Sequence, residues 1–222
     1  FVDVGLPPEE VEQLVAVGDL ISIRRDMITL KNRYVAGKAM DNRASVAAVT
    51  LTLEQLHTIL HPWDVVAVAT IQEETGLKGA TTAAYGVAPQ LAIALDVTFG
   101  EQAHLSNDET LPLDAGPSIG FGPNFHPQLV ARLEEVAKAH EIPYHREPIP
   151  GRSGTDAWAI QVSREGVPTG LLSIPVRYMH QPIETLAVAD IERTARLLTA
   201  FIASLETDFL GKLAWKPATE GE

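Results

Sequence analysis

The 222-residue chain contains no cysteine. The absence of cysteine excludes a disulfide framework and any zinc site built on thiolates, so a bound metal would have to be held by His, Asp or Glu. Basic residues are also few: 17 Lys and Arg stand against 29 Asp and Glu, a net charge of 17 − 29 = −12. An acidic chain repels phosphate backbones, and we therefore expect no nucleic-acid partner.

Long apolar runs are missing too. No stretch approaches the ~20 consecutive apolar residues of a membrane span, and no N-terminal segment has the basic-then-apolar plan of a signal peptide. We therefore predict no membrane partner. A cytoplasmic location is our default expectation. The chain begins with Phe1 rather than Met, which predicts that it is a piece of a longer protein.

What is present is the composition of a globular protein, with 45% hydrophobic and 21% charged residues. Residues 1–36 differ from the rest of the chain in their predicted secondary structure. They contain an acidic helical segment that opens on Pro7 and Pro8, followed by β-like runs at 20–24, 27–30 and 34–36. We predict that 1–36 form the C-terminal part of a small β-rich domain, that 37–210 form a second domain, and that 211–222 are a solvated tail.

From residue 37 onward, helical and strand patterns alternate. Helices are expected at 44–60, 77–85, 126–140, 155–162 and 185–205. Strands are expected at 64–71, 90–97, 118–121 and 168–175. This alternation predicts an α/β fold with a central mixed, mainly parallel sheet flanked by helices.

Acidic and imidazole side chains stand where these elements begin or end. Asp41 precedes the first long helix, Glu73 and Glu74 follow the first expected strand, Asp96 lies near the end of the second, and His180 follows the last. Because α/β sheets bind ligands at the carboxyl ends of their strands, these side chains are candidates for one cluster. Taken singly, each has an ordinary alternative as a cap, a solvated charge or a structural histidine.

Such a cluster would repel itself strongly unless a cation neutralised it. Zinc, cobalt and manganese accept mixed carboxylate and imidazole ligands. Two such ions can clamp one hydroxide between them, and a carboxylate left over could then serve as general base. His57 and His61 have the i, i+4 spacing of a zinc pair but no third ligand near them. The glycine-rich stretch 151–155 lacks the lysine of a phosphate loop, and no G-x-S-x-G motif occurs.

Five motifs carry a resemblance that goes beyond spacing. In order along the chain they are GKAMDNRA at 37–44, QEETGLKGA at 72–80, ALDVT at 94–98, GTDA at 154–157 and IPVRYMH at 174–180. Together they resemble the glutamyl-aminopeptidase/endoglucanase-type dimetal metallopeptidases, the family of the TET aminopeptidases. The resemblance extends from residue 1 to about residue 205.

The resemblance implies a phosphorylase/hydrolase-like dimetal peptidase fold and a metal-dependent aminopeptidase that removes N-terminal residues from short peptides. It implies two divalent metal ions, zinc or cobalt, as cofactors. Asp41 matches the carboxylate that bridges the two ions, Glu74 and His180 match ligands of one, and Asp96 matches a ligand of the other. Glu73 matches the catalytic base.

The family also implies a homo-oligomer, from dimers to tetrahedral dodecamers, in which residues 1–36 are the remnant of a dimerisation domain. A further metal-ligand His of the family lies upstream in an HxD motif, and no His precedes Asp41 here. We therefore expect an N-terminally incomplete chain with weak or absent activity by itself. Arg177 is expected to line the substrate cleft or form a structural ion pair. Asp156 is expected to support the ligands from behind or to cap a helix, of which we favour the cap. A dimetal deacylase or carboxypeptidase, or a scaffold that has lost catalysis, remain as alternatives.

Overall fold

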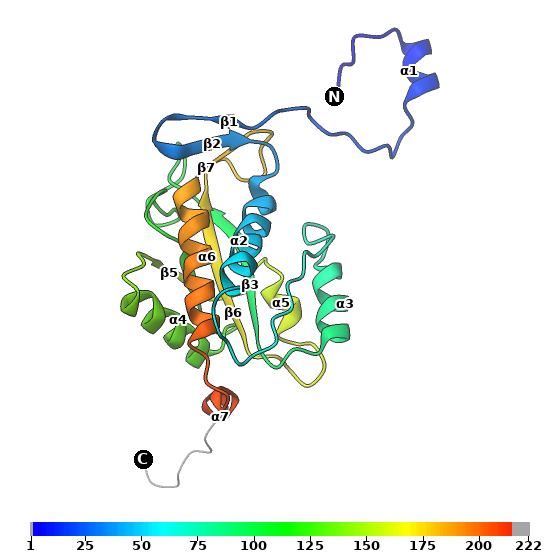
Figure 1. The fold of residues 1–222 in the computed structure, drawn as a ribbon. Helices are drawn as coiled ribbons and strands as arrows, with labels where there is room; N and C mark the ends of the chain where they lie inside the picture. The colour runs from blue at the N-terminus through cyan, green and yellow to red at the C-terminus, as the bar shows by residue number, and fades with distance from the viewer. Residues whose placement is uncertain (1, 215–222) are drawn as a thin grey trace.

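The computed structural model describes residues 2–214 (Figure 1). Its strands are β1 (Ile28–Thr29), β2 (Tyr34–Gly37), β3 (Ala92–Phe99), β4 (Ser118–Phe121), β5 (His145–Pro148), β6 (Thr169–Val176) and β7 (Glu184–Ala187). Its helices are α1 (Pro8–Leu14), the short 3₁₀ turn Lys31–Arg33, α2 (Met40–Leu56), α3 (Lys78–Val87), α4 (Pro127–Ala139), α5 (Ala157–Ile160), α6 (Val188–Ala203) and α7 (Phe209–Leu213).

The main sheet has four strands in the order β3-β6-β4-β5. β3 is parallel to β6 and β4 is parallel to β5, whereas β4 and β6 are antiparallel. Every residue of β6 is buried, as expected for a strand covered on both faces. The predicted α/β class with a mixed sheet flanked by helices is confirmed.

Two long helices, α2 and α6, lie side by side across β3 and β6 (Figure 1). Small buried side chains at their contact, Ala44 and Ala48 of α2 and Ala195 of α6, let the helices approach closely. The Thr52 hydroxyl also donates to the carbonyl of Ala195 at 3.4 Å. This packing fixes the start of α2, where Asp41 lies.

A smaller antiparallel sheet has the order β1-β2-β7. Its β2–β7 register pairs Gly37 with Glu184, so the end of β2 lies beside the start of β7. The N-terminal arm with α1 extends away from the body (Figure 1), and α1 buries no residue. The strand predicted at 20–24 is wrong. These residues are exposed and pair with no strand in the described part of the chain, and Ser22 accepts a hydrogen bond from the Lys38 ammonium group at 2.6 Å. The predicted domain boundaries stay predictions.

The strand predicted at 64–71 is also wrong. These residues form irregular, mostly exposed chain, and Val66, Val68 and Ile71 are all exposed. Their Val and Ala content favours a buried strand, but composition cannot reveal whether a partner strand lies alongside. Within residues 2–214, no strand pairs with this segment.

Two further boundaries differ from prediction. The expected helix 185–205 begins as strand β7 and becomes helix only at Val188. The expected tail after 210 instead starts within α7, whose Leu213 is buried against the main core. The rest of that predicted tail, residues 215–222, lies outside the described residues. No helix among residues 2–214 combines the length and the apolar character needed to cross a membrane.

Candidate metal centre

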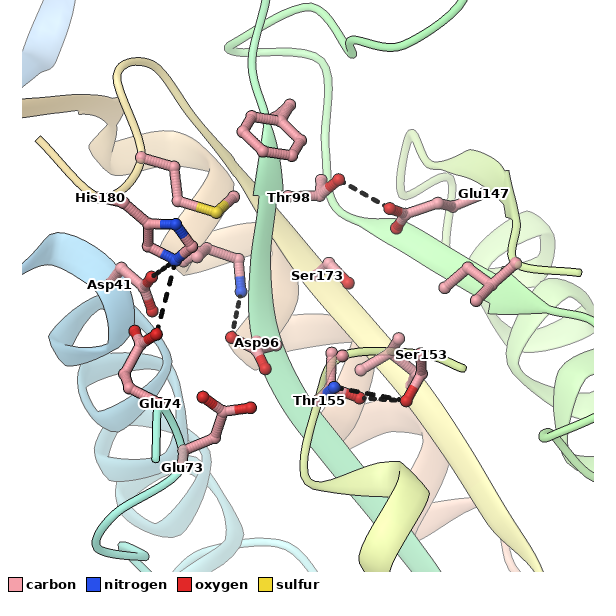
Figure 2. Close-up of a pocket in the computed structure, with 16 residues that line it drawn as sticks. Asp41, Glu73, Glu74, Asp96, Thr98, Glu147, Ser153, Thr155, Ser173 and His180 are labelled. Atoms are coloured by element: carbon pink, nitrogen blue, oxygen red, sulfur yellow. Dashed lines mark hydrogen bonds and ion pairs between the residues drawn. The ribbon is translucent and has the colours of Figure 1, made fainter. Parts of the chain in front are cut away.

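A cavity of about 270 Å³ opens over the C-terminal half of β3 and the middle of β6 (Figure 2). Its titratable lining residues are Asp41, Glu73, Glu74, Asp96, Glu147 and His180. Among the described residues that line it there is no Lys or Arg. The protein therefore brings several carboxylates together without a cationic side chain in the cavity wall.

Three of these side chains converge. One ligand-type atom from each of Asp41, Glu74 and His180 lies within 4.8 Å of the others. His180 Nε2 is 3.2 Å from Asp41 Oδ2 and 3.6 Å from Glu74 Oε2 (Figure 2). Asp96 lines the same cavity but is not part of this group of three. The structure thus gathers all the residues that the sequence offered as metal ligands, three of them in mutual contact range.

Asp41 is held where the chain turns from β2 into α2. Ala39 adopts a left-handed conformation with φ of 54°, and Asp41 and Asn42 have not yet reached helical geometry. The backbone N–H of Asp41 donates to the Glu184 carboxylate at 3.0 Å. Only 9% of the Asp41 side chain is exposed, so this carboxylate faces the cavity rather than bulk solvent.

Asp96 lies on β3 and is 8% exposed. Its Oδ1 accepts hydrogen bonds from the Asn42 side-chain amide at 3.0 Å and from the backbone N–H of Val97 at 2.8 Å. The same Asn42 amide donates to the carbonyl of Leu95 at 3.1 Å. Asn42 therefore couples the start of α2 to β3 and orients the Asp96 carboxylate.

Glu73 and Glu74 reach the cavity although no strand precedes them. The carbonyl of Glu73 accepts the backbone N–H groups of Gly76 and Leu77, both at 3.0 Å, which closes a tight turn. The N–H of Gly79, in the first turn of α3, donates to the carbonyl of Ile71 at 2.9 Å. The position of the two glutamates thus comes from the turn that leads into α3.

Burial and mutual repulsion raise the pKa values of the carboxyl groups. Burial, followed by the charges of Glu74 and Glu184, raises the pKa of Asp41 to about 6, against an opposing effect of His180. Burial and the charges of Glu74, Asp156 and Asp41 raise the pKa of Glu73 to about 7.

Asp96 shows the same effect most strongly. Burial raises its pKa to about 8, although the Val97 N–H stabilises the ionised form. A set of carboxylates and one imidazole that the protein leaves electrostatically uncompensated fits a divalent cation. The donor set therefore agrees with the metal that the sequence resemblance implied.

Other predicted positions are placed differently. The Nε of Arg177 donates to the carbonyl of Glu101 at 2.5 Å, and Arg177 is not among the cavity's lining residues. Its substrate-binding role stays a prediction. Asp156 stands at the N-terminus of α5 but makes no side-chain cap; it accepts from the Thr70 hydroxyl at 2.5 Å instead. The capping role expected for Asp156 is wrong.

His57 and His61 do not join the metal group found among residues 2–214. His61 Nδ1 lies 2.8 Å from the carbonyl of Trp63, which occupies one of its two ring nitrogens.

Sequence reasoning missed three polar residues around the cavity. Asn42 and Glu184 contact the candidate ligands directly, and Glu147 accepts from the hydroxyls of Thr98 and Ser118 at 2.6 and 2.5 Å. Asn42 stands next to Asp41 inside a quoted motif, so its position was a usable signal. Glu184 offers no such signal, because the sequence predicts one helix over 185–205 and gives no indication of the strand β7 that Glu184 begins.

A mixed α/β sheet with a carboxylate–imidazole cluster in a cleft at its edge is typical of metal-dependent enzymes. Comparison with known families makes this specific. The family of M42 glutamyl aminopeptidases matches residues 1–197, and the chain belongs to that family.

Among curated relatives, the lysyl aminopeptidase of Pyrococcus furiosus is 37% identical over 208 residues, which cover 93% of this chain and 60% of that protein. Among solved structures, an aminopeptidase of the archaeon Desulfurococcus kamchatkensis superposes with a TM-score of 0.84 at 34% identity, covering 98% of this chain and 62% of that one. The Pyrococcus horikoshii TET1 peptidase superposes with a TM-score of 0.73 at 30% identity, covering 89% and 58%. The chain thus spans about 60% of the length of the curated relatives it matches.

Proposed function

We propose that this protein is a dimetal aminopeptidase that removes N-terminal residues from short peptides. The observation that carries the proposal is the convergence of Asp41, Glu74 and His180 beside Glu73, in a chain that belongs to an aminopeptidase family. The metal and the reaction are inferred from the side chains that would serve them.

Asp41, Glu74 and His180 would hold one divalent ion, zinc or cobalt. Asp41 would be shared with a second ion that also uses Asp96. When bound, such ions supply Lewis-acid polarisation of the scissile carbonyl and charge stabilisation for the attacking water. Asp41 is buried, lines the same cavity as Asp96, and its charge acts on the Asp96 carboxyl group, which supports the shared role.

Glu73 is the proposed general base. It lines the cavity, is partly buried, and is not one of the three residues that could hold one ion together, so its carboxylate is left to act on the attacking water. Glu73 would take a proton from the attacking water and pass it to the nitrogen of the leaving amine as the peptide bond breaks. Glu73 would thus be ionised again at the end of the reaction, as it was at the start.

The acidic cavity also favours a substrate with a cationic end. Two lining carboxylates, Glu73 and Glu147, are not assigned to the metals, and no Lys or Arg stands among the described lining residues, so the protonated α-amine of a peptide would find anionic partners there. A free N-terminus is therefore the proposed recognition element. The P. horikoshii relative is described as assembling into a tetrahedron or an octahedral shell, and we propose a homo-oligomer here as well. A cytoplasmic location remains a prediction.

The test is hydrolysis of Leu-, Glu- and Lys-p-nitroanilides and of their N-acetylated counterparts by the protein expressed from its complete gene, with Co²⁺, Zn²⁺ or EDTA. The 222-residue chain is assayed in parallel. Metal-dependent cleavage of the free-amine substrates alone supports the proposal. Release of acyl groups from N-acylated substrates would instead indicate a deacylase, and metal binding without any hydrolysis would indicate a scaffold.

A further inference from the structure

Glu184 is a buried carboxylate that the proposed mechanism does not use. It is 2% exposed and does not line the cavity. Its Oε2 accepts the backbone N–H of Asp41 at 3.0 Å, and its Oε1 accepts the backbone N–H of His180 at 3.0 Å. One side chain thus binds the backbones of two candidate metal ligands that are 139 positions apart in sequence, 180 − 41.

The strand pairing explains why this residue can reach both. Glu184 begins β7 and lies opposite Gly37, the last residue of β2, from which the chain turns to Asp41. The start of β7 also forms one side of a hairpin. Reciprocal backbone hydrogen bonds between Arg177 and Thr185, at 2.8 and 3.1 Å, close the base of this hairpin. The loop of that hairpin carries His180. Glu184 therefore lies where the two ligand-bearing loops meet.

The His180 loop needs such support. His180 has φ of +63°, and Tyr178 in the same loop has φ of +62°. Both values lie in the left-handed region, which L-residues with a Cβ adopt unwillingly. A hydrogen bond from the His180 N–H to a fixed, buried acceptor holds this conformation. Both carboxylate oxygens of Glu184 accept these backbone hydrogen bonds, and no Lys or Arg within residues 2–214 forms an ion pair with it.

We propose that Glu184 is a positioning residue that sets the separation of Asp41 and His180 and thereby the metal affinity of the site. This inference rests on the proposed function, since it requires that Asp41 and His180 bind metal. Groups that orient ligands from behind typically change metal affinity about 10–100-fold when they are replaced.

The test is the Glu184→Gln variant of the chain, titrated with Co²⁺ alone and with Zn²⁺ alone. Glutamine keeps one acceptor oxygen but turns an NH₂ group toward the second backbone N–H, so one ligand loop is released. The expected results are a rise in the Kd for metal of about 10–100-fold and a changed visible absorption spectrum of the Co²⁺ form. The spectrum reports ligand geometry, which a general loss of stability would not alter.

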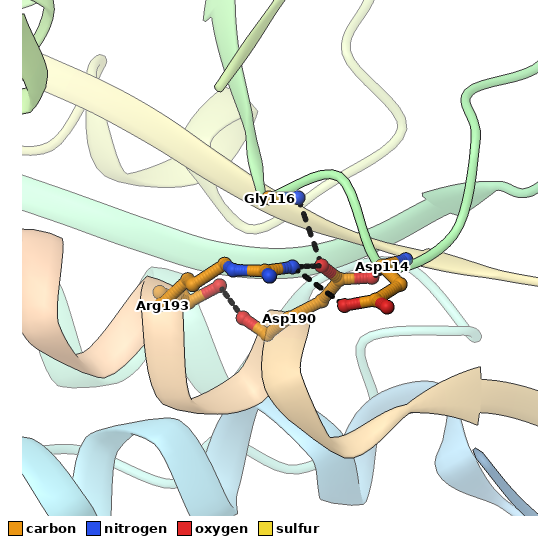
Figure 3. A network of polar contacts seen from close by, with 5 residues as sticks. Asp114, Gly116, Asp190 and Arg193 are labelled. Carbon is orange, nitrogen blue, oxygen red and sulfur yellow. Dashed lines mark hydrogen bonds and ion pairs between the residues drawn. The ribbon is translucent and has the colours of Figure 1, made fainter. Parts of the chain in front are cut away.

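Asp190 offers a matched control (Figure 3). It is a fully buried carboxylate that accepts two backbone N–H groups, from Asp114 at 2.6 Å and Gly116 at 2.8 Å, and it contacts no candidate ligand. It differs from Glu184 in also pairing with Arg193 at 3.2 Å. Asp190→Asn should lower thermal stability as Glu184→Gln does, but leave the metal Kd and the Co²⁺ spectrum unchanged.

The outcomes separate the two proposals. A wild-type chain that binds no metal would overturn the proposed function and this inference with it. A wild-type chain that binds metal, with an unchanged Kd and spectrum in Glu184→Gln, would overturn the inference alone, as would equal losses of affinity in Glu184→Gln and Asp190→Asn. Should Glu184→Gln fail to fold, Glu184→Asp takes its place: its shorter arm cannot reach both N–H groups, and an unchanged Kd in that variant would overturn the inference.

Discussion

Metal binding to this site should release protons at neutral pH, because the carboxyl groups of the cavity hold protons that a cation must displace. The pKa values are about 6 for Asp41, about 7 for Glu73 and about 8 for Asp96. At pH 7 these values correspond to occupancies of about 0.1, 0.5 and 0.9, or about 1.5 protons in all. At pH 8 the sum falls to about 0.6.

The raised pKa values also determine how the stability of the metal-free chain changes with pH. All three carboxyl groups have raised pKa values in the folded chain, so the metal-free fold binds more protons than the unfolded chain between about pH 4 and pH 8. The stability of the metal-free chain should therefore fall as pH rises through that window. Metal affinity should rise over the same range, since ionised carboxylates are the ligands.

Isothermal calorimetry of Co²⁺ binding, in buffers of different ionisation enthalpy at pH 7 and pH 8, measures the released protons directly. The control is Asp96→Asn, which should keep the Asp41, Glu74 and His180 group but release about one proton fewer at pH 7. No proton release by the wild type at pH 7, or the same release by both proteins, would refute the electrostatic account of the cavity.

Three substitutions give further predictions. Glu73→Gln should keep its metal and lose about 10²–10⁴-fold in the rate of p-nitroanilide hydrolysis, as expected for a lost general base; loss of metal with an unchanged rate per bound ion would contradict that role. Gly79→Ala places a Cβ 2.5 Å from both the N and the O of Ile71, so it should shift the turn that carries Glu73 and Glu74 and raise the metal Kd, whereas Gly86→Ala, with no atom within 4 Å, should leave that Kd as it is. Gly116→Ala places a Cβ 1.9 Å from the carbonyl oxygen of Pro143 at a φ of +95°. The free energy of unfolding should therefore fall by about 2–4 kcal/mol, measured by thermal unfolding. The control is Gly211→Ala, whose Cβ meets open space; equal melting temperatures for the two variants would show that the loop of Gly116 adapts freely.

Local patterns predicted the parts of the fold that depend on local sequence. The apolar stripes of α2, α4 and α6 and the buried runs of β3 and β6 follow from periodicity, and the structure has all of these elements. The segment 64–71 shows the limit of that reasoning. Whether a Val-rich run becomes a strand depends on a neighbour that lies elsewhere in the sequence, and composition alone does not contain that information.

The residues of the candidate site likewise fall into those that the sequence could indicate and those that it could not. Acidic and imidazole residues could be proposed as ligands from the sequence, and Asp41, Glu74 and His180 do converge, although the strand expected before Glu74 does not form. Glu184 could not, because its importance arises from the β2–β7 register and from two backbone N–H groups rather than from its neighbours in sequence. Backbone donors leave no trace in a residue pattern, so the residue that links the two loops emerges only in three dimensions.

The most direct measurement is a crystal structure of the chain soaked with Co²⁺ or Zn²⁺ and recorded at the metal's absorption edge. The account predicts an anomalous peak between Asp41, Glu74 and His180, with ligand atoms at about 2.0–2.2 Å. A peak elsewhere on the molecule, or none at millimolar metal, would contradict the claim that a cation unites these side chains.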